Sequence, residues 1–86
     1  MKAIESIKAQ VESLIVFKGT TVREVDEEWD TIGKRIDEGI QKMKDYKHFT
    51  ENEIDDVHKH AIIVRKQRWE SARSDVKTKE RLEFVF

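Results

Sequence analysis

Cysteine and proline are both absent from this chain of 86 residues, and glycine occurs only at positions 19, 33 and 39. The absence of cysteine excludes disulfide bonds and thiolate chemistry, and the absence of proline removes the strongest helix breaker. The longest apolar run, Leu14 to Phe17, falls far short of the ~20 residues that a bilayer span needs. The N-terminus has an acidic residue at Glu5 and no long apolar segment after it, so it does not resemble a signal peptide. We therefore expect one cytoplasmic helical domain with no membrane partner.

Charge is abundant, and its signs are unevenly distributed along the chain. Charged residues make up 41% of the chain, hydrophobic residues make up 37%, and the formal net charge is −1. Acidic residues outnumber basic ones between residues 20 and 56, whereas basic residues predominate between residues 57 and 81. So high a charge on so short a chain predicts a thin hydrophobic core, which favours self-association.

A first helix is predicted over residues 2–17. Its apolar residues recur at three- and four-residue steps, which places them on one face of a helix. Gly19 follows, and there we expect a left-handed helix cap, a conformation that glycine adopts most readily. The apolar stripe consists of Ile4, Ile7, Val11 and Leu14.

Two longer helices are predicted over residues 22–46 and 51–80. Each is preceded by a capping box, in which a threonine hydroxyl and a glutamate carboxylate accept backbone N–H groups at the start of the helix. The two boxes are formed by Thr21 with Glu24 and by Thr50 with Glu53. The apolar residues of the first of these helices repeat nearly every seven positions, which is typical of a helix that packs along its whole length against another.

The short connection near residues 47–50 requires the two long helices to run antiparallel as neighbours. Folding the chain about this turn brings together residues whose numbers sum to about 97. Trp29 then lies near Trp69 and Glu24 near Arg73, with the acidic start of one helix beside the basic end of the other. Caps, stripes and charges agree on an all-α fold with a short N-terminal helix and a long antiparallel helical hairpin.

The apolar residues are too numerous for a single seam between two helices. The surplus is concentrated in residues 14–17, 62–64 and 82–86. A monomer would expose part of this surface, and large exposed apolar patches mark interaction sites. We therefore expect the chain to complete a helical bundle by homo-oligomerisation.

Two pairs of acidic residues suggest a metal-dependent activity. Glu24 and Glu27 are three positions apart, and Glu53 and Asp56 repeat this spacing on the next helix. The pattern resembles that of the MazG-like all-α nucleotide pyrophosphohydrolases, in which acids on two helices hold magnesium in a four-helix dimeric assembly. The resemblance implies that these four carboxylates bind Mg²⁺, which prefers oxygen ligands, and that the chain cleaves nucleoside triphosphates.

The C-terminal residues 81–86 differ from the helices before them, because their apolar residues alternate with the period of a strand. Leu82, Glu83, Phe84 and Phe86 resemble the short peptides that DNA polymerases, loaders and phage late-transcription factors insert into sliding clamps. The resemblance implies that these four residues bind a protein partner. The favoured interpretation is that the tail folds back over the first helix or over a partner chain, because exposed terminal apolar residues most often find their own core.

Basic and aromatic residues of the third predicted helix form another candidate binding surface. Arg65, Arg68, Trp69 and Arg73 lie beside its apolar stripe, and basic stripes attract phosphate backbones. Pairing with the acidic helix explains the same charges, and the net charge of −1 repels nucleic acid at long range. Direct nucleic-acid binding is therefore not the favoured interpretation.

From these patterns we predict a small binding or regulatory protein that acts through protein–protein contacts, with no catalytic residue, metal or cofactor. Highly charged, compact helical chains suit adaptors, inhibitors and phage-type modulators of host machinery. Two alternatives stay open. One is an accessory factor of replication or transcription that binds a sliding clamp or nucleic acid, and the other is the magnesium-dependent pyrophosphohydrolase.

Overall fold

The computed structural model describes residues 3–46 and 48–85, with the side chains described for residues 4–46 and 48–80. This part of the chain forms three helices and no strand, so the predicted all-α class is confirmed. None of its helices is long and apolar enough to cross a membrane. The helices are α1 (Ala3–Leu14), α2 (Val22–Tyr46) and α3 (Glu51–Val85).

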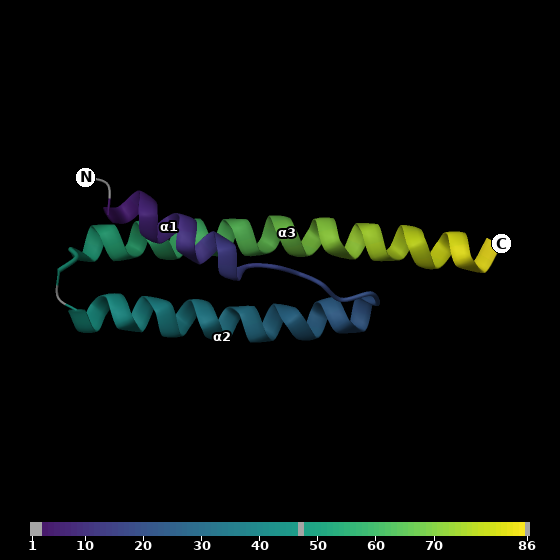
Figure 1. Cartoon of the computed structure of the whole chain (residues 1–86), viewed down its shortest axis with the longest axis horizontal. Helices are drawn as coiled ribbons and strands as arrows, with labels where there is room; N and C mark the ends of the chain where they lie inside the picture. Colours follow the sequence, from purple (N-terminus) through teal and green to yellow (C-terminus); the bar gives the residue numbers. More distant parts are fainter. Residues whose placement is uncertain (1–2, 47, 86) are drawn as a thin grey trace.

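The three helices form an elongated molecule with principal extents of 55 × 21 × 15 Å. Helices α2 and α3 lie side by side and run in opposite directions, and α1 lies across the first half of α3 (Figure 1). Residues 15–21 connect α1 to α2 without forming a helix and run along the pair toward the start of α2 (Figure 1). One half of the α2–α3 pair is therefore covered by a helix and the other half by an irregular segment.

Both long helices begin at the threonines that the capping boxes indicated. At α3 the box is reciprocal: the Glu53 backbone N–H donates to Thr50 Oγ1 over 3.1 Å, and the Thr50 N–H donates to Glu53 Oε1 over 2.8 Å. At α2 the Glu24 N–H donates to Thr21 Oγ1 over 3.1 Å. The Glu24 carboxylate accepts from the hydroxyls of Thr20 and Thr21 instead of from a backbone N–H. Each helix start thus has backbone donors satisfied locally.

The hydrophobic core follows the α2–α3 seam and is thin, as the composition predicted. Apolar side chains of both helices are buried along it, and α1 contributes half-buried residues from one side. Ile15, from the connection after α1, is fully buried in the same cluster. The central cluster comprises Ile15, Ile32, Ile36, Ile40, Met43, Val57, Ala61 and Val64.

The predicted extent of the first helix is wrong at its end, because α1 ends at Leu14 and not at residue 17. Arg68 of α3 stops the helix by donating from Nη1 to the carbonyl oxygens of Glu12, over 2.6 Å, and Ile15, over 3.1 Å. A positive side chain at the C-terminal end of a helix satisfies free carbonyls and complements the helix dipole. Breaking the helix here frees Ile15 to enter the core.

The predicted left-handed cap at Gly19 is also wrong, since Gly19 does not have a positive φ. Its backbone N–H donates to Glu28 Oε1 over 2.7 Å, and the Lys18 N–H donates to Glu28 Oε2 over 2.8 Å. A Cβ atom at residue 19 would lie 2.8 Å from the Glu24 Cβ and 2.9 Å from the backbone nitrogen of Val25. Glycine is needed here because the connection runs directly against the first turn of α2.

The third helix is longer than predicted. It runs to Val85 and not to residue 80, so the strand-like interpretation of residues 81–86 is wrong for 81–85. No glycine or proline occurs after Gly39, and a three-step alternation is too short to overcome the helix propensity of lysine, arginine, glutamate and leucine. Val76 is the last buried residue in the described part of α3, and the helix continues past the start of α2 (Figure 1).

We predict that Gly19→Ala lowers the melting temperature and that Gly39→Ala raises it. At residue 19 the added methyl group overpacks a tight contact, which costs about 1–3 kcal/mol and corresponds to roughly 4–8 °C per kcal/mol in a domain of this size. At residue 39 the methyl group meets nothing within 4 Å, so the helix gains about 0.5–1 kcal/mol. Thermal unfolding followed by circular dichroism at 222 nm measures both. Equal shifts for the two variants would contradict the packing described for Gly19.

Candidate functional site

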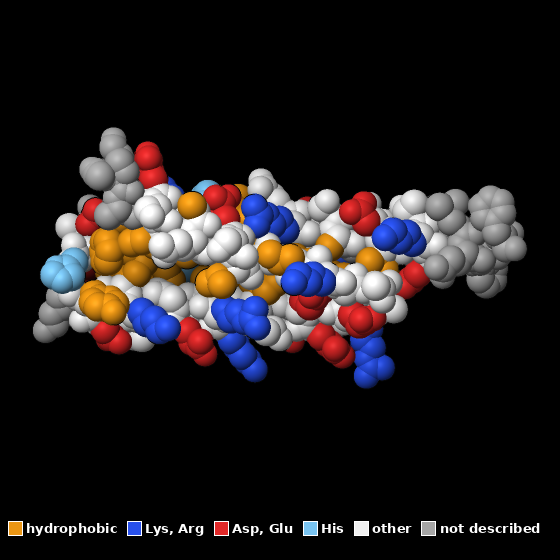
Figure 2. Space-filling model, viewed as in Figure 1, with side chains coloured by type: hydrophobic (Ala, Val, Ile, Leu, Met, Phe, Trp, Pro, Cys, Tyr) orange, Lys and Arg blue, Asp and Glu red, His pale blue; other side chains and the backbone are white. Residues whose placement is uncertain are grey.

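An open apolar groove lies between α1 and the C-terminal half of α2, with a volume of about 530 Å³. Figure 2 shows hydrophobic side chains gathered on this face, at the end of the molecule where α2 connects to α3. Phe49 of the connection closes one end. The walls are formed by Ile7, Val11 and Leu14 of α1 and by Ile40, Met43 and Tyr46 of α2.

The groove stays open because α1 is fastened to α3 and contacts α2 less extensively. Lys8 of α1 pairs with Asp56 of α3 at 2.6 Å between Nζ and Oδ2. Near the other end of α1, Arg68 of α3 holds the last carbonyls of the helix. Gly39 of α2 leaves an empty space of at least 4 Å where a side chain would project. No side chain of α2 therefore fills the gap at this level.

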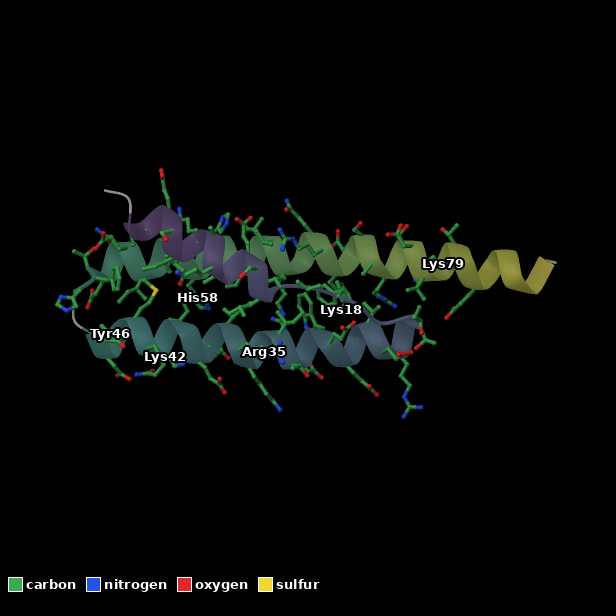
Figure 3. The ribbon with its side chains drawn as sticks, viewed as in Figure 1. Lys18, Arg35, Lys42, Tyr46, His58 and Lys79 are labelled. Carbon is green, nitrogen blue, oxygen red and sulfur yellow. The ribbon has the colours of Figure 1, made fainter. Side chains whose placement is uncertain are left out.

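Two groove residues expose large apolar side chains to water. Leu14 is 49% exposed and Tyr46 is 68% exposed, although both belong to the apolar stripes of their helices. Figure 3 shows Tyr46 near the C-terminal end of α2, one turn beyond Lys42. Covering such residues removes apolar surface from water, at roughly 25 cal/mol per Å². A partner that covered the groove would be stabilised by this burial.

The polar residues that border the groove are Gln10, Lys42 and His48, and all three are exposed. No aspartate or glutamate lines it, and the ion pairs between described residues do not include Lys42. The border is thus neutral to basic in a chain whose α2 is otherwise rich in acidic residues. This arrangement suits an apolar partner with an acidic or neutral edge.

Arg65, one of the basic residues predicted to bind a partner, lies inside the α2–α3 interface. Its Nη2 donates to the carbonyl oxygen of Trp29 over 2.6 Å, and its guanidinium lies 3.5 Å from the centroid of the Trp29 ring. Burial lowers the pKa of Arg65, while the nearby carboxylates of Asp30 and Asp37 raise it by a smaller amount. The guanidinium occupies the space beside Gly33, where a Cβ atom would lie 2.5 Å from Nη2.

Trp69 and Arg73 are held by the start of α2. The Trp69 ring lies 4.9 Å from the Trp29 ring, so the predicted proximity of the two tryptophans is confirmed. Trp69 Nε1 donates to Asp26 Oδ1 over 3.0 Å, and the same carboxylate oxygen lies 3.4 Å from Arg73 Nε. The acidic partner of Arg73 is thus Asp26 and not Glu24, which caps α2.

Arg65, Arg68, Trp69 and Arg73 therefore all make contacts within the chain, and their polar groups hold the three helices together. The other predicted partner-binding residues are at the C-terminus. The side chains of Leu82, Glu83 and Phe84 lie outside the described residues, as does the whole of Phe86. The backbone at residues 82–84 belongs to α3.

The carboxylates of the magnesium hypothesis do not come together within one chain. Glu24 and Glu27 lie at the start of α2, where Glu27 pairs with Arg23 at 3.5 Å. Glu53 caps α3 at the opposite end of α2, some 35 Å away along the helix. Asp56 pairs with Lys8. In the part of the chain that the structure describes, no three His, Asp or Glu side chains are placed to share a metal ion.

The groove residues were not predicted as a binding site. The periodicity assigned Ile7, Val11, Ile40 and Met43 to buried stripes. This is confirmed for Ile40 and Met43, which are buried, whereas Ile7 and Val11 are only half-buried. The available signal was the surplus of apolar residues at 14–17, which required a surface that no helix seam could cover. The apolar periodicity alone could not show which two helices would leave a groove between them.

Comparisons of the chain with protein-family models, with curated proteins and with solved structures gave no match.

We predict that Arg68→Ala lowers the free energy of unfolding by about 1–3 kcal/mol, because it removes charge-assisted hydrogen bonds to two carbonyl oxygens. Lys66→Ala, at an exposed position two residues away, is the matched control and changes stability by less than about 0.5 kcal/mol. Urea denaturation followed by circular dichroism measures both. Equal stability of Arg68→Ala and Lys66→Ala would show that Arg68 does not fasten α1 and is available to a partner.

Proposed function

We propose that this chain is a non-catalytic protein-interaction module that binds an amphipathic helix of a protein partner in the groove between α1 and α2. The observation that carries the proposal is the exposure of Leu14 and Tyr46 beside an open apolar groove, on a chain in which 41% of residues are charged. Exposed apolar patches on small soluble proteins mark interaction sites.

A helix is the shape that best matches the groove. Its walls are two helices, and along each wall the apolar residues span about two turns, or roughly 10 Å. A helix laid between α1 and α2 would place its apolar stripe against both walls and keep its polar side in water, which is a common mode of peptide recognition. The gap at Gly39 allows close approach of a helix backbone.

The rest of the molecule supplies a frame for this surface. The antiparallel hairpin of α2 and α3 is tied by Arg65, Trp29 and Trp69, and α1 is tied to the hairpin by Arg68 and Lys8. These contacts use the basic and aromatic residues that a nucleic-acid surface would need. They favour a protein partner over nucleic acid.

We predict that a photoreactive benzoylphenylalanine at Tyr46 forms a covalent adduct with a protein in the cells that produce this chain. The label lies at the edge of the groove, within reach of a bound helix. Mass spectrometry should map the adduct to a segment of the partner whose apolar residues have helical spacing. The same label at Ile63, an apolar residue of α3 that is 55% exposed and outside the groove, should form no such adduct.

A second variant tests whether the groove carries the affinity. Leu14→Lys places a charge in the groove but preserves α1, because the dipole favours a cation at the C-terminal end of a helix. It should weaken the adduct at Tyr46 about tenfold or more, whereas Ile63→Lys should leave it unchanged. Labelling that is equal at Tyr46 and Ile63, or that is insensitive to Leu14→Lys, would refute the proposed function.

A further inference from the structure

The C-terminal part of α3 extends beyond the rest of the molecule. Val76 is buried, residues 77–80 are exposed, and the helix continues to Val85 past the start of α2 (Figure 1). Figure 3 shows Lys79 on this projecting part, which we call the overhang and define as residues 77–85. In the described structure neither α1 nor α2 lies beside it (Figure 1). Most helices in proteins derive their stability from packing against a neighbour, so a neighbour from another chain would stabilise the overhang.

The overhang and the groove are similar in length, and both contain apolar residues. Nine helical residues span about 13 Å, and the apolar residues along each groove wall span roughly 10 Å. The overhang sequence includes Leu82, Phe84 and Val85, and helical spacing places Leu82 and Val85 on the same face.

The positions of these two surfaces allow two copies to satisfy each other. The groove lies at one end of a molecule 55 Å long, and the overhang lies at the other end (Figure 1). When a second copy is turned end for end, its overhang comes beside the first groove and the first overhang comes beside the second groove. The arrangement is a closed two-fold dimer, in which the groove of each copy binds the overhang of the other. A net charge of −1 gives little long-range repulsion between the copies.

We infer that the helix bound in the groove is the overhang of α3 from a second copy of this chain, and that the active form is a reciprocally exchanged dimer. The inference depends on the proposed function, because it names the partner of the same groove. Exchange of C-terminal helical segments would cover the groove with Leu14 and Tyr46 and would give the overhang a helical neighbour.

Light scattering coupled to size exclusion tests the inference on the purified full chain. The expected mass is twice that of one chain at tens of micromolar. Leu14→Lys, in the groove, and Leu82→Glu, in the overhang, should each raise the dimer dissociation constant about tenfold or more, whereas Ile63→Lys should leave it unchanged. A synthetic peptide of residues 75–86 should compete with the exchange and convert the dimer into monomers with bound peptide. The peptide competition uses the unchanged chain, so its result does not depend on whether a variant folds.

Mixing the two defective variants tests reciprocity. Leu14→Lys retains an intact overhang and Leu82→Glu retains an intact groove, so the mixture should form a heterodimer with one intact contact that neither variant forms alone. Differently tagged chains reveal it by co-purification. A dimer that forms in all variants, or a mixture that stays monomeric while the full chain dimerises, would place the interface elsewhere and overturn the inference.

Cross-linking fixes the location of the contact. Benzoylphenylalanine at Tyr46 of the purified chain should form an inter-chain adduct, and trypsin, which cleaves after Arg81, should leave the fragment 82–86 attached to it. The same fragment cannot arise within one chain, because roughly 45 Å of α3 separates the two ends. A chain that stays monomeric up to 100 μM, yet forms adducts with another protein through Tyr46, would overturn the dimer and leave the proposed function intact.

Discussion

The seating of Arg65 in the space beside Gly33 is the contact on which the rest of the structure depends. The guanidinium donates to the carbonyl oxygen of Trp29 and covers the face of its ring at 3.5 Å. Any side chain at residue 33 would overlap the guanidinium. A planar, charged group of this size fits the space beside Gly33, and a shift of α3 by one turn would separate this half-buried charge from its acceptor. The contact therefore fixes the register of the two long helices.

The register of α2 against α3 in turn decides where the groove and the overhang lie. With Trp29 beside Trp69, the start of α2 falls opposite Val76, and everything after Val76 on α3 projects beyond it. At the other end the short connection closes the pair, and α1 reaches only this half of α3 (Figure 1). The remaining half is covered by residues 15–21, which are held by the Glu28 carboxylate. The result is an elongated molecule with the apolar groove at one end and the projecting part of α3 at the other.

The local elements could be predicted because their causes are local. The capping threonines precede α2 and α3 by one residue, and the absence of proline left nothing to interrupt the helices. The proximity of Trp29 and Trp69 followed from the short connection and a constant rise per residue. The end of α1 could not be predicted, because the side chain that stops it, Arg68, is 53 residues away from Ile15.

The basic and aromatic residues of α3 show most clearly how a pattern can mislead about function. A stripe of arginines beside a tryptophan has the composition of a nucleic-acid or protein interface. Whether this stripe faces solvent depends on the residues of the opposite helix. Here the Arg65 guanidinium fits beside Gly33 and against the Trp29 ring, and Asp26 accepts a hydrogen bond from Trp69. The basic and aromatic residues of α3 therefore do bind other groups, but those groups belong to α2 of the same chain and not to a second molecule.

The sequence by itself determined the helical class, the starts of the long helices and the pairing of α2 with α3, since each depends on neighbouring residues or on chain connectivity. Only the tertiary structure decided that α1 would lie on α3 and leave a groove beside α2, and that α3 would continue as a helix to Val85. The periodic apolar residues of α1 fit either neighbour equally well. The choice was made by contacts from far along the chain, Lys8 with Asp56 and Arg68 with the last carbonyls of α1, and no local pattern records such contacts.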